Sequence, residues 1–298
     1  MKLVLLVLLG LAVLTAAAMV WQHLRYLNTR REVVQDRQAL LHASDAFHSL
    51  TFLRVREGAD AIDAVRGLKQ ELAGAGDVGW VYAGLVAVDA LASDQLGAKS
   101  WGAVVLLQHG SRADFDRLAD SDAWRKALDR FAETYTHGLQ RPRGLNLLIP
   151  QMLLALRTRL MLSGGPDGYP FEPMAEGTPA PENVDRIARL VQSRELGADA
   201  IVIVNLLKQG TPEQRAADNA YGMRMAEMMA WLGYGPMHMG RAVTVEGDAD
   251  FDRVALVYYP GVDYFVSMAR SSYFQGIIGG KQLADTQATI TVPILDRL

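Results

Sequence analysis

The stretch that decides the fold is residues 251–274, FDRVALVYYPGVDYFVSMARSSYF, which has the pattern of a buried strand followed by an amphipathic helix. The same order occurs 150 positions earlier, in residues 101–124, WGAVVLLQHGSRADFDRLADSDAW. Any two strand–helix units match at some apolar positions, but the shared Ala-x-Ser-x-x-aromatic pattern favours an internal repeat. The matched pairs are Val104 with Val254, Leu106 with Leu256, Phe115 with Phe265, Ala119 with Ala269, Ser121 with Ser271, and Trp124 with Phe274.

Periodicity around these two stretches predicts the other elements. In the first half we expect strands at 45–56, 78–88 and 102–108, helices at 59–72 and 114–135, and a short strand near Leu139. In the second half we expect strands at 200–207, 237–245, 253–259 and 289–294, and helices at 212–232 and 262–278. Each half then has a β-α-β-β-α-β order.

The amino-terminal segment predicts a membrane anchor. Leu3–Trp21 contains 19 residues without a charge, and as a helix it would span roughly 28 Å, the thickness of a hydrocarbon core. Arg25, Arg30, Arg31 and Arg37 follow it, so the positive-inside rule places the soluble part in the cytoplasm, on a single-pass inner-membrane anchor. The alternative is a cleaved signal peptide with Ala16–Ala18 as its cleavage site, and an exported protein.

A second apolar segment, Leu145–Leu162, is interrupted by Pro150 and has arginines nearby. One interpretation is a helix packed against the first domain. The other is a helix on the membrane surface, with its apolar side towards the lipid and its arginines at the head groups. Arg157 and Arg159 make a second transmembrane span the less favoured interpretation.

The chain has 298 residues, a net charge of −3 and no cysteine. The charge does not suggest a nucleic-acid surface, so we expect no nucleic-acid partner. The missing cysteine excludes disulfides, thiolate metal sites and cysteine nucleophiles. Neither a GxSxG, Walker or HExxH motif nor a dinucleotide fingerprint occurs in the sequence.

Residues 199–298 resemble the domain of unknown function 1330 family, which belongs to the dimeric α/β barrel superfamily. The resemblance rests on residues 202–208 (VIVNLLK), 240–242 (GRA) and 251–260 (FDRVALVYYP), followed by Phe265, Met268, Ser271 and 272–275 (SYFQ). It implies a ferredoxin-like fold. Residues 45–142 look like a diverged copy, with Gln108-His109-Gly110 at the position of Tyr258-Tyr259-Pro260.

The expected fold class is therefore α+β: a transmembrane helix followed by two tandem ferredoxin-like domains that form an intrachain barrel-like pseudo-dimer. A homo-oligomer is not required if the two domains pair within the chain. The predicted boundaries are an anchor at 1–25, a helical stalk at 26–44, the first domain at 45–142, an apolar helix and Pro/Gly linker at 143–182, and the second domain at 183–298.

Four residues of the second half are candidates for ligand binding. Asn205 lies in an apolar strand, where its amide either points into the barrel or pairs with a neighbouring loop. His238 and Arg241 flank Gly240, and His238 has no second ligand at a metal-binding spacing. Tyr258 and Tyr259 point to opposite faces of one strand, so one of them should face the barrel.

These features favour a ligand-binding or protein-interaction module that works without a cofactor, with a small apolar ligand or a protein as its partner. The alternative is a small enzyme of monooxygenase or isomerase type, or a haem-binding protein, that uses the barrel cavity of the second domain. This alternative rests on fold analogy. It requires a closed cavity with converging polar groups.

Overall fold

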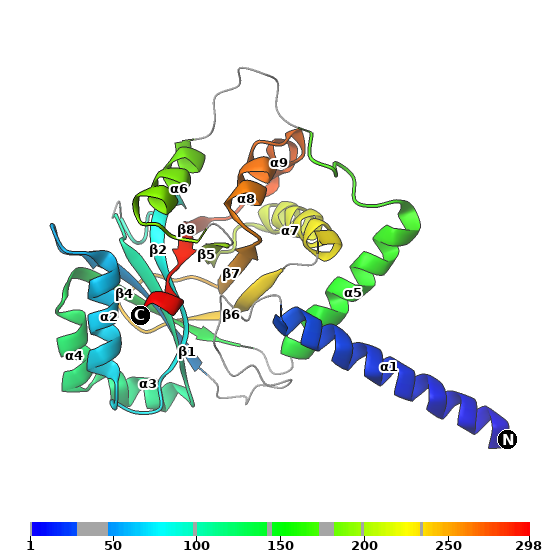
Figure 1. The fold of residues 1–298 in the computed structure, drawn as a ribbon, viewed down its shortest axis with the longest axis horizontal. Coiled ribbons are helices and arrows are strands. Elements are labelled where there is room, and N and C mark those ends of the chain that lie inside the picture. The colour runs from blue at the N-terminus through cyan, green and yellow to red at the C-terminus, as the bar shows by residue number, and fades with distance from the viewer. Residues whose placement is uncertain are drawn as a thin grey trace.

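The structure is a computed structural model that describes residues 2–28, 47–97, 100–141, 145–172, 182–197, 200–232 and 235–298. Its strands wrap into one barrel, and a long amino-terminal helix projects from this body (Figure 1). Most of the predicted stalk and part of the Pro/Gly linker lie outside the described residues.

Eight strands close the barrel. The first half supplies β1 (Phe47–Val55), β2 (Gly79–Leu91), β3 (Ala103–His109) and β4 (Phe131–Gln140), and the second half supplies β5 (Ile201–Lys208), β6 (Pro236–Thr244), β7 (Arg253–Tyr259) and β8 (Asp285–Pro293). Their order around the barrel is β1-β3-β2-β8-β5-β7-β6-β4, and all neighbours are antiparallel. Each half thus contributes four adjacent strands in the same order, and the halves join where β2 pairs with β8 and β4 with β6.

Alternate residues of each strand point into the barrel or out of it. The inward side chains form an inner cluster that includes Leu50, Phe52, Val104, Val204 and Leu256. The outward side chains form an outer cluster under the helices. Both faces of most strands are buried, which explains why these strands lack an apolar–polar alternation in the sequence.

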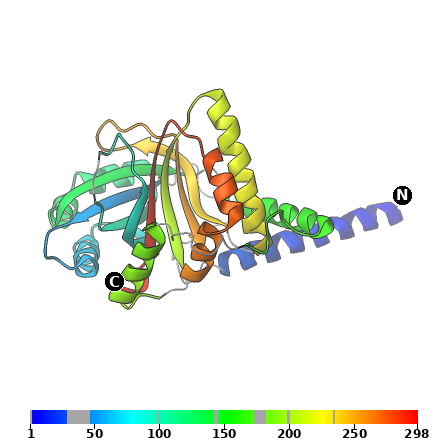
Figure 2. The same cartoon turned by 90° about the horizontal axis from the view of Figure 1, so that it is seen from above.

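Helices cover the outside of the barrel (Figures 1 and 2). The first half carries α2 (Ala61–Leu72), α3 (Arg112–Ala119) and α4 (Asp122–Leu128). The second half carries α7 (Pro212–Leu232), α8 (Val262–Ala269), α9 (Ser272–Ile277) and the 3-10 turn η1 (Ile278–Gly280). A helix that the sequence analysis missed, α6 (Glu182–Ser193), packs against β2 and α8.

The single helix predicted at 114–135 is wrong, because two helices and the start of a strand occupy this range. Ser121 ends the first helix and caps the second, since its hydroxyl oxygen accepts a hydrogen bond from the Trp124 amide. Phe131, assigned to the apolar stripe of that helix, begins β4 and packs in the outer cluster. Ser271 divides the predicted helix at 262–278 in the same way, and it caps α9 through the Phe274 amide.

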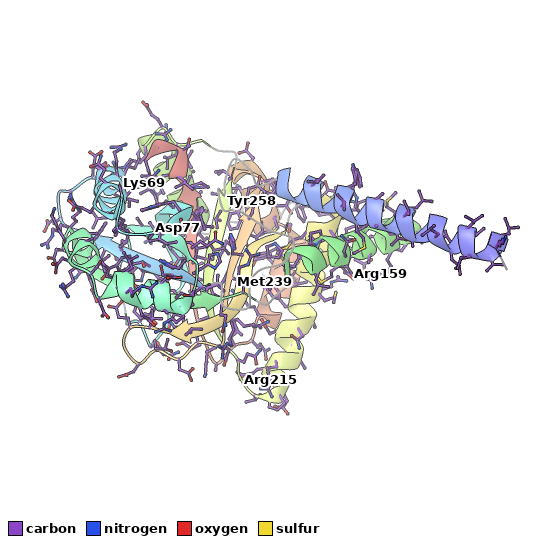
Figure 3. All side chains as sticks on the ribbon, turned by 90° about the horizontal axis from the view of Figure 1, so that it is seen from below. Lys69, Asp77, Arg159, Arg215, Met239 and Tyr258 are labelled. Atoms are coloured by element: carbon purple, nitrogen blue, oxygen red, sulfur yellow. The ribbon has the colours of Figure 1, made fainter. Side chains whose placement is uncertain are left out.

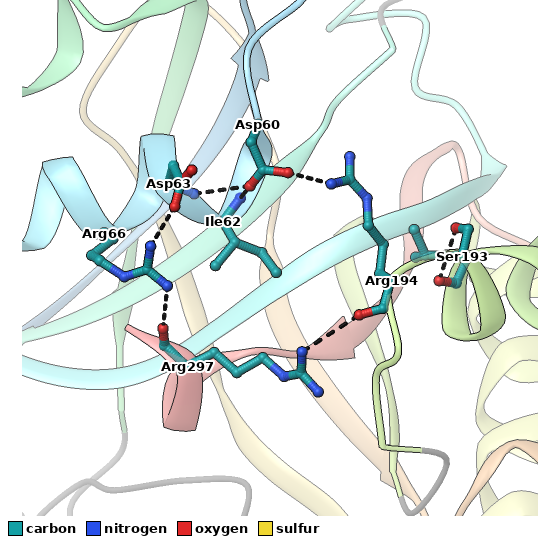
Figure 4. A network of polar contacts seen from close by, with 8 residues as sticks. Asp60, Ile62, Asp63, Arg66, Ser193, Arg194 and Arg297 are labelled. Carbon is teal, nitrogen blue, oxygen red and sulfur yellow. Dashed lines mark hydrogen bonds and ion pairs between the residues drawn. The ribbon is translucent and has the colours of Figure 1, made fainter.

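Polar contacts tie the end of the chain to the first half (Figure 4). The Asp60 carboxylate caps α2 and also pairs with Arg194, which follows α6. Arg66 of α2 donates to the carbonyl oxygen of Arg297, in the closing turn η2 (Leu295–Arg297). Arg297 in turn donates to the carbonyl oxygens of Arg194 and Glu195. These contacts join the two halves outside the barrel.

The projecting helix α1 (Lys2–Asn28) is long and apolar enough over Lys2–Trp21 to cross a membrane, and none of that stretch is buried. Both a membrane anchor and a signal sequence have these properties. Near its carboxyl end α1 contacts α5 (Leu145–Ser163), where the Gln151 amide donates to the carbonyl oxygen of Met19 over 3.2 Å. Pro150 lies inside α5 without ending it, although a proline in the second turn removes one i→i−4 backbone hydrogen bond.

Candidate functional site

Two of the four predicted ligand residues point into the barrel. His238 on β6 is fully buried and its ring lies beside that of His48 on β1. Tyr258 on β7 packs against both clusters and lies opposite Val202 of the inner cluster, whereas Tyr259 is buried in the outer cluster. The prediction that these two tyrosines face opposite sides of the strand is therefore confirmed.

The other two candidates lie outside the barrel. The side-chain amide of Asn205 donates to the carbonyl oxygens of Ile203 and Ala255, and its oxygen accepts from Lys281, 3.1 Å away in the segment after η1. This arrangement is the loop pairing that we considered for Asn205. Arg241 is exposed and donates to the side-chain oxygen of Gln140 on β4 over 2.5 Å. For Lys281, the residue that donates to Asn205, desolvation lowers the pKa.

Two interior histidines were not among the predicted residues. His48 shares the inward face of β1 with Leu50 and Phe52, and its ring centroid lies 5.3 Å from that of His238. His137 on β4 is fully buried, and its Nδ1 shares a hydrogen bond of 2.9 Å with the Tyr135 hydroxyl. In the sequence, the only sign of these two histidines was a polar residue at a strand position whose neighbours at i±2 are mostly apolar.

His137 is a neutral imidazole at pH 7, because burial lowers its pKa to about 4. Its Nε2 has no hydrogen-bond partner within the described part of the chain. Two further polar contacts lie in the interior. The Tyr82 hydroxyl bonds with that of Thr291 over 2.6 Å, and the Thr289 hydroxyl donates to the Asp89 carboxylate.

Aliphatic and aromatic side chains fill most of the barrel interior, including Phe52, Trp101, Leu106, Leu206 and Phe251. A haem macrocycle would have to displace several of these nearly inaccessible side chains, so the interior does not fit that group. Across the described residues, no group of three or more His, Asp or Glu side chains is arranged to hold a metal ion.

A cavity of about 400 Å³ lies on the outside of the first half. The loop between α2 and β2 forms one wall, and the turn from β3 into α3 forms the other. Figure 3 labels Asp77 in the first of these walls. The lining residues are Ala75, Gly76, Asp77, Val78, His109, Gly110, Asp114, Arg117 and Leu118.

His109 is the buried polar residue of this cavity. Its Nε2 shares a hydrogen bond of 2.8 Å with the hydroxyl of Ser49, which is fully buried on β1. Desolvation lowers the pKa of His109 to about 4, although the nearby Asp114 charge acts in the opposite direction. His109 is therefore neutral at pH 7 and offers a hydrogen-bonding imidazole to the cavity.

The turn after His109 is tightly built. The Ser111 hydroxyl donates to the Asp114 carboxylate and accepts from the Asp114 amide, which caps α3. This hydroxyl and the Arg117 guanidinium hold the pKa of Asp114 below its usual range. A Cβ on Gly110 would lie 2.8 Å from the Asp114 carboxylate, so the turn has little room for a larger residue there.

A second hollow of about 550 Å³ lies beside α6 and is more open. Its lining comes from one face of that helix and from Ala87 on β2. The His109 cavity is the better candidate site, because a buried polar pair, a capped turn and charged rim residues converge on it.

No family model and no curated protein matches the chain. Among solved structures, a "putative monooxygenase" from Lactobacillus acidophilus aligns with a TM-score of 0.42 and 7% identity, over 84% of this chain and 94% of that one. A mutant chlorite dismutase from Candidatus Nitrospira defluvii aligns with a TM-score of 0.45 and 13% identity, over 87% of this chain and 96% of that one. These values describe a similar mixed α/β arrangement of strands and helices and carry no information on activity.

Proposed function

We propose that this protein is a membrane-anchored ligand-binding module, in which two ferredoxin-like halves close one barrel within a single chain. The four strands of each half follow the same spatial order in the barrel, which supports the tandem arrangement. So do the residues 150 positions apart: Phe115 and Phe265 both pack in the outer cluster, and Ser121 and Ser271 both cap a helix. The resemblance of residues 199–298 to the domain of unknown function 1330 family is in line with this proposal.

The anchor part of the proposal is supported by the fully exposed apolar surface of α1. A monomeric soluble protein rarely exposes so large a contiguous apolar surface. We place the body on the cytoplasmic side, since basic residues follow the apolar stretch. A reporter enzyme that is active only in the cytoplasm, fused to the carboxyl terminus, tests this orientation. An inactive cytoplasmic reporter, together with activity of a second fused reporter that works only on the exported side and a shortened amino terminus by mass spectrometry, would support the cleaved signal peptide instead.

The single observation that carries the binding part is the His109 cavity, where the buried Ser49–His109 pair meets the charged rim residues Asp77 and Arg117. Apolar groups of Ala75, Val78 and Leu118 also line it. The matching ligand is a small molecule with an apolar part and at least one hydrogen-bonding group.

Binding fits this cavity better than acid–base catalysis. An efficient general base has a pKa near the working pH, and burial holds the pKa of His109 at about 4. The Ser49 hydroxyl is fully buried behind the imidazole and is not part of the cavity lining, so a substrate would not reach it. The pair therefore orients a ligand rather than attacking it.

A thermal-shift screen of the full chain in detergent tests the proposal, because a ligand that binds the folded state raises the melting temperature. Arg117→Gln should reduce the shift produced by a hit. Arg125→Gln is the matched control: Arg125 forms the same i, i+3 ion pair with Asp122 on α4 but does not line the cavity. Equal shifts in both variants would exclude this cavity as the binding site.

The second candidate is a small enzyme that works in the barrel interior, and the proximity of the His48 and His238 rings there is the observation in its favour. It predicts that His238→Gln abolishes an activity that Arg117→Gln leaves intact. The filled interior does not fit the haem version of this candidate, so we expect no Soret absorbance band in protein purified from haem-supplemented cells.

A further inference from the structure

Helix α5 has two different apolar faces. Ile149, Leu153 and Leu160 are buried, and the helix packs against α7 of the body and against α1. The neighbouring face is exposed to solvent although it is largely apolar: Leu148 is 62% exposed and Leu162 is 87% exposed. Met152, one turn after Leu148, lies on the same face and is also exposed, and Arg159 shares this face between Met152 and Leu162. The packing within the protein therefore explains only one side of this helix.

The position of α5 relative to α1 indicates what covers the second face. The hydrogen bond from Gln151 to Met19 places α5 beside the end of the apolar stretch, next to Trp21, whose side chain is exposed. Tryptophan is enriched at the boundary between hydrocarbon and water. In Figure 1, α5 runs across the base of α1 rather than along it. A helix placed across a membrane span at this level lies in the plane of the interface.

We infer that α5 is an interfacial helix, whose exposed apolar face inserts into the same bilayer leaflet that α1 enters. This inference rests on the proposed anchor. A lipid surface is the occupant that the contacts favour, because α5 packs against α1, whose apolar side chains are exposed. Amphipathic helices of this kind insert roughly 5–10 Å, to the boundary between head groups and acyl chains.

Charged groups on α5 agree with shallow insertion. Arg159, labelled in Figure 3, is exposed on the same face as Met152 and Leu162, and its guanidinium pairs with Glu227 of α7. A long arginine side chain places its charge at head-group level while its stem stays on apolar surface. The helix therefore holds the body at a defined height and orientation above the membrane, which a single spanning helix would leave free to rotate.

The absence of cysteine makes this inference directly testable, since one introduced thiol carries one fluorescent label. The full chain is reconstituted in lipid nanodiscs as Leu162→Cys, Met152→Cys, Leu9→Cys or Lys126→Cys. Lys126 lies on α4 and is 70% exposed, so its label reports solvent. Quenchers are attached to the lipids either near the head group or deep in the acyl chain.

We expect labels at positions 162 and 152 to be quenched mainly by the shallow lipid, the label at position 9 mainly by the deep lipid, and the label at 126 by neither. Quenching at position 9 without quenching at 152 and 162 would overturn the interfacial helix and leave the anchor intact. If the labels at 152 and 162 are unquenched and the protein is a dimer in the nanodisc, a second copy of the chain covers this face of α5. An unquenched label at position 9 would overturn the anchor, and with it the proposed function.

Discussion

The two halves place different residues at one equivalent position of the barrel. His109 ends β3 and Tyr259 ends β7, 150 positions later, and both rings pack edge-on against a phenylalanine, Phe115 in the first half and Phe265 in the second. The ring centroids are 5.2 Å and 5.3 Å apart, respectively. The packing partner is thus kept while the residue that packs against it differs.

The neighbouring strand differs in the same place. Ser49 on β1 pairs with Leu107 just before His109, and Ile203 on β5 pairs with Val257 just before Tyr259. The first half therefore buries a hydrogen-bonded Ser–His pair where the second half buries an isoleucine and a tyrosine. The aromatic contact is thus common to both halves, whereas the polar pair is particular to the first half, where His109 lines the adjacent cavity.

The largest expected effect tests the shared packing. Phe115→Ala and Phe265→Ala should each lower the free energy of unfolding by about 3–5 kcal/mol, because each removes a buried ring from the outer cluster. Urea denaturation followed by tryptophan fluorescence measures this change. Phe→Leu at both positions is the control and should cost less. Since the barrel joins both halves, we expect one transition, and two separate transitions would contradict a common core.

A smaller expected effect is a pH dependence of the unfolding free energy that arises from His109 in the first half. The folded-state pKa of His109 is about 4 and the ordinary value is 6.5, so stability is full above pH 6.5 and is lost as the pH falls towards 4. This pKa difference corresponds to about 3 kcal/mol at most. His109→Gln should flatten the pH dependence of the unfolding free energy between pH 7 and pH 4.5.

Tyr259→Phe in the second half is the control and should leave this slope unchanged, because tyrosine does not titrate in that range. His137, whose pKa is also about 4, supplies the slope that remains in His109→Gln. An unchanged slope in His109→Gln would mean that its imidazole is protonated in the folded protein near pH 6.5.

The smallest effect concerns the two serine caps. Ser121→Ala and Ser271→Ala should each cost about 1 kcal/mol, since each hydroxyl accepts from an amide of the following helix. The loss should be larger at Ser271, which is fully buried, than at Ser121. Thermal unfolding of both variants measures the difference. Ser→Thr keeps the hydroxyl and should restore most of the stability at Ser121.

Local patterns in the sequence were sufficient to place most elements. Apolar spacing located α7 and β7 with the boundaries that the structure shows, and uninterrupted apolar character located α1. These signals work because the period of a helix and the length of an apolar run depend on neighbours in the chain. The split between α3 and α4 was missed, since Ser121 reads as an ordinary polar residue until its hydroxyl is seen to cap the Trp124 amide.

The tertiary structure alone decided which side chains meet. Asn205 lies in a strand buried on both faces, so no alternation in the sequence shows that it points out of the barrel towards Lys281. His48 and His238 are brought together from opposite halves, by closure of the barrel through β4 and β6. The sequence by itself determined the apolar amino-terminal helix and the repeated strand–helix order. The inner polar contacts required the closed barrel, and the cavity beside His109 required the two segments that line it to meet, because in both cases the partners are distant in the chain.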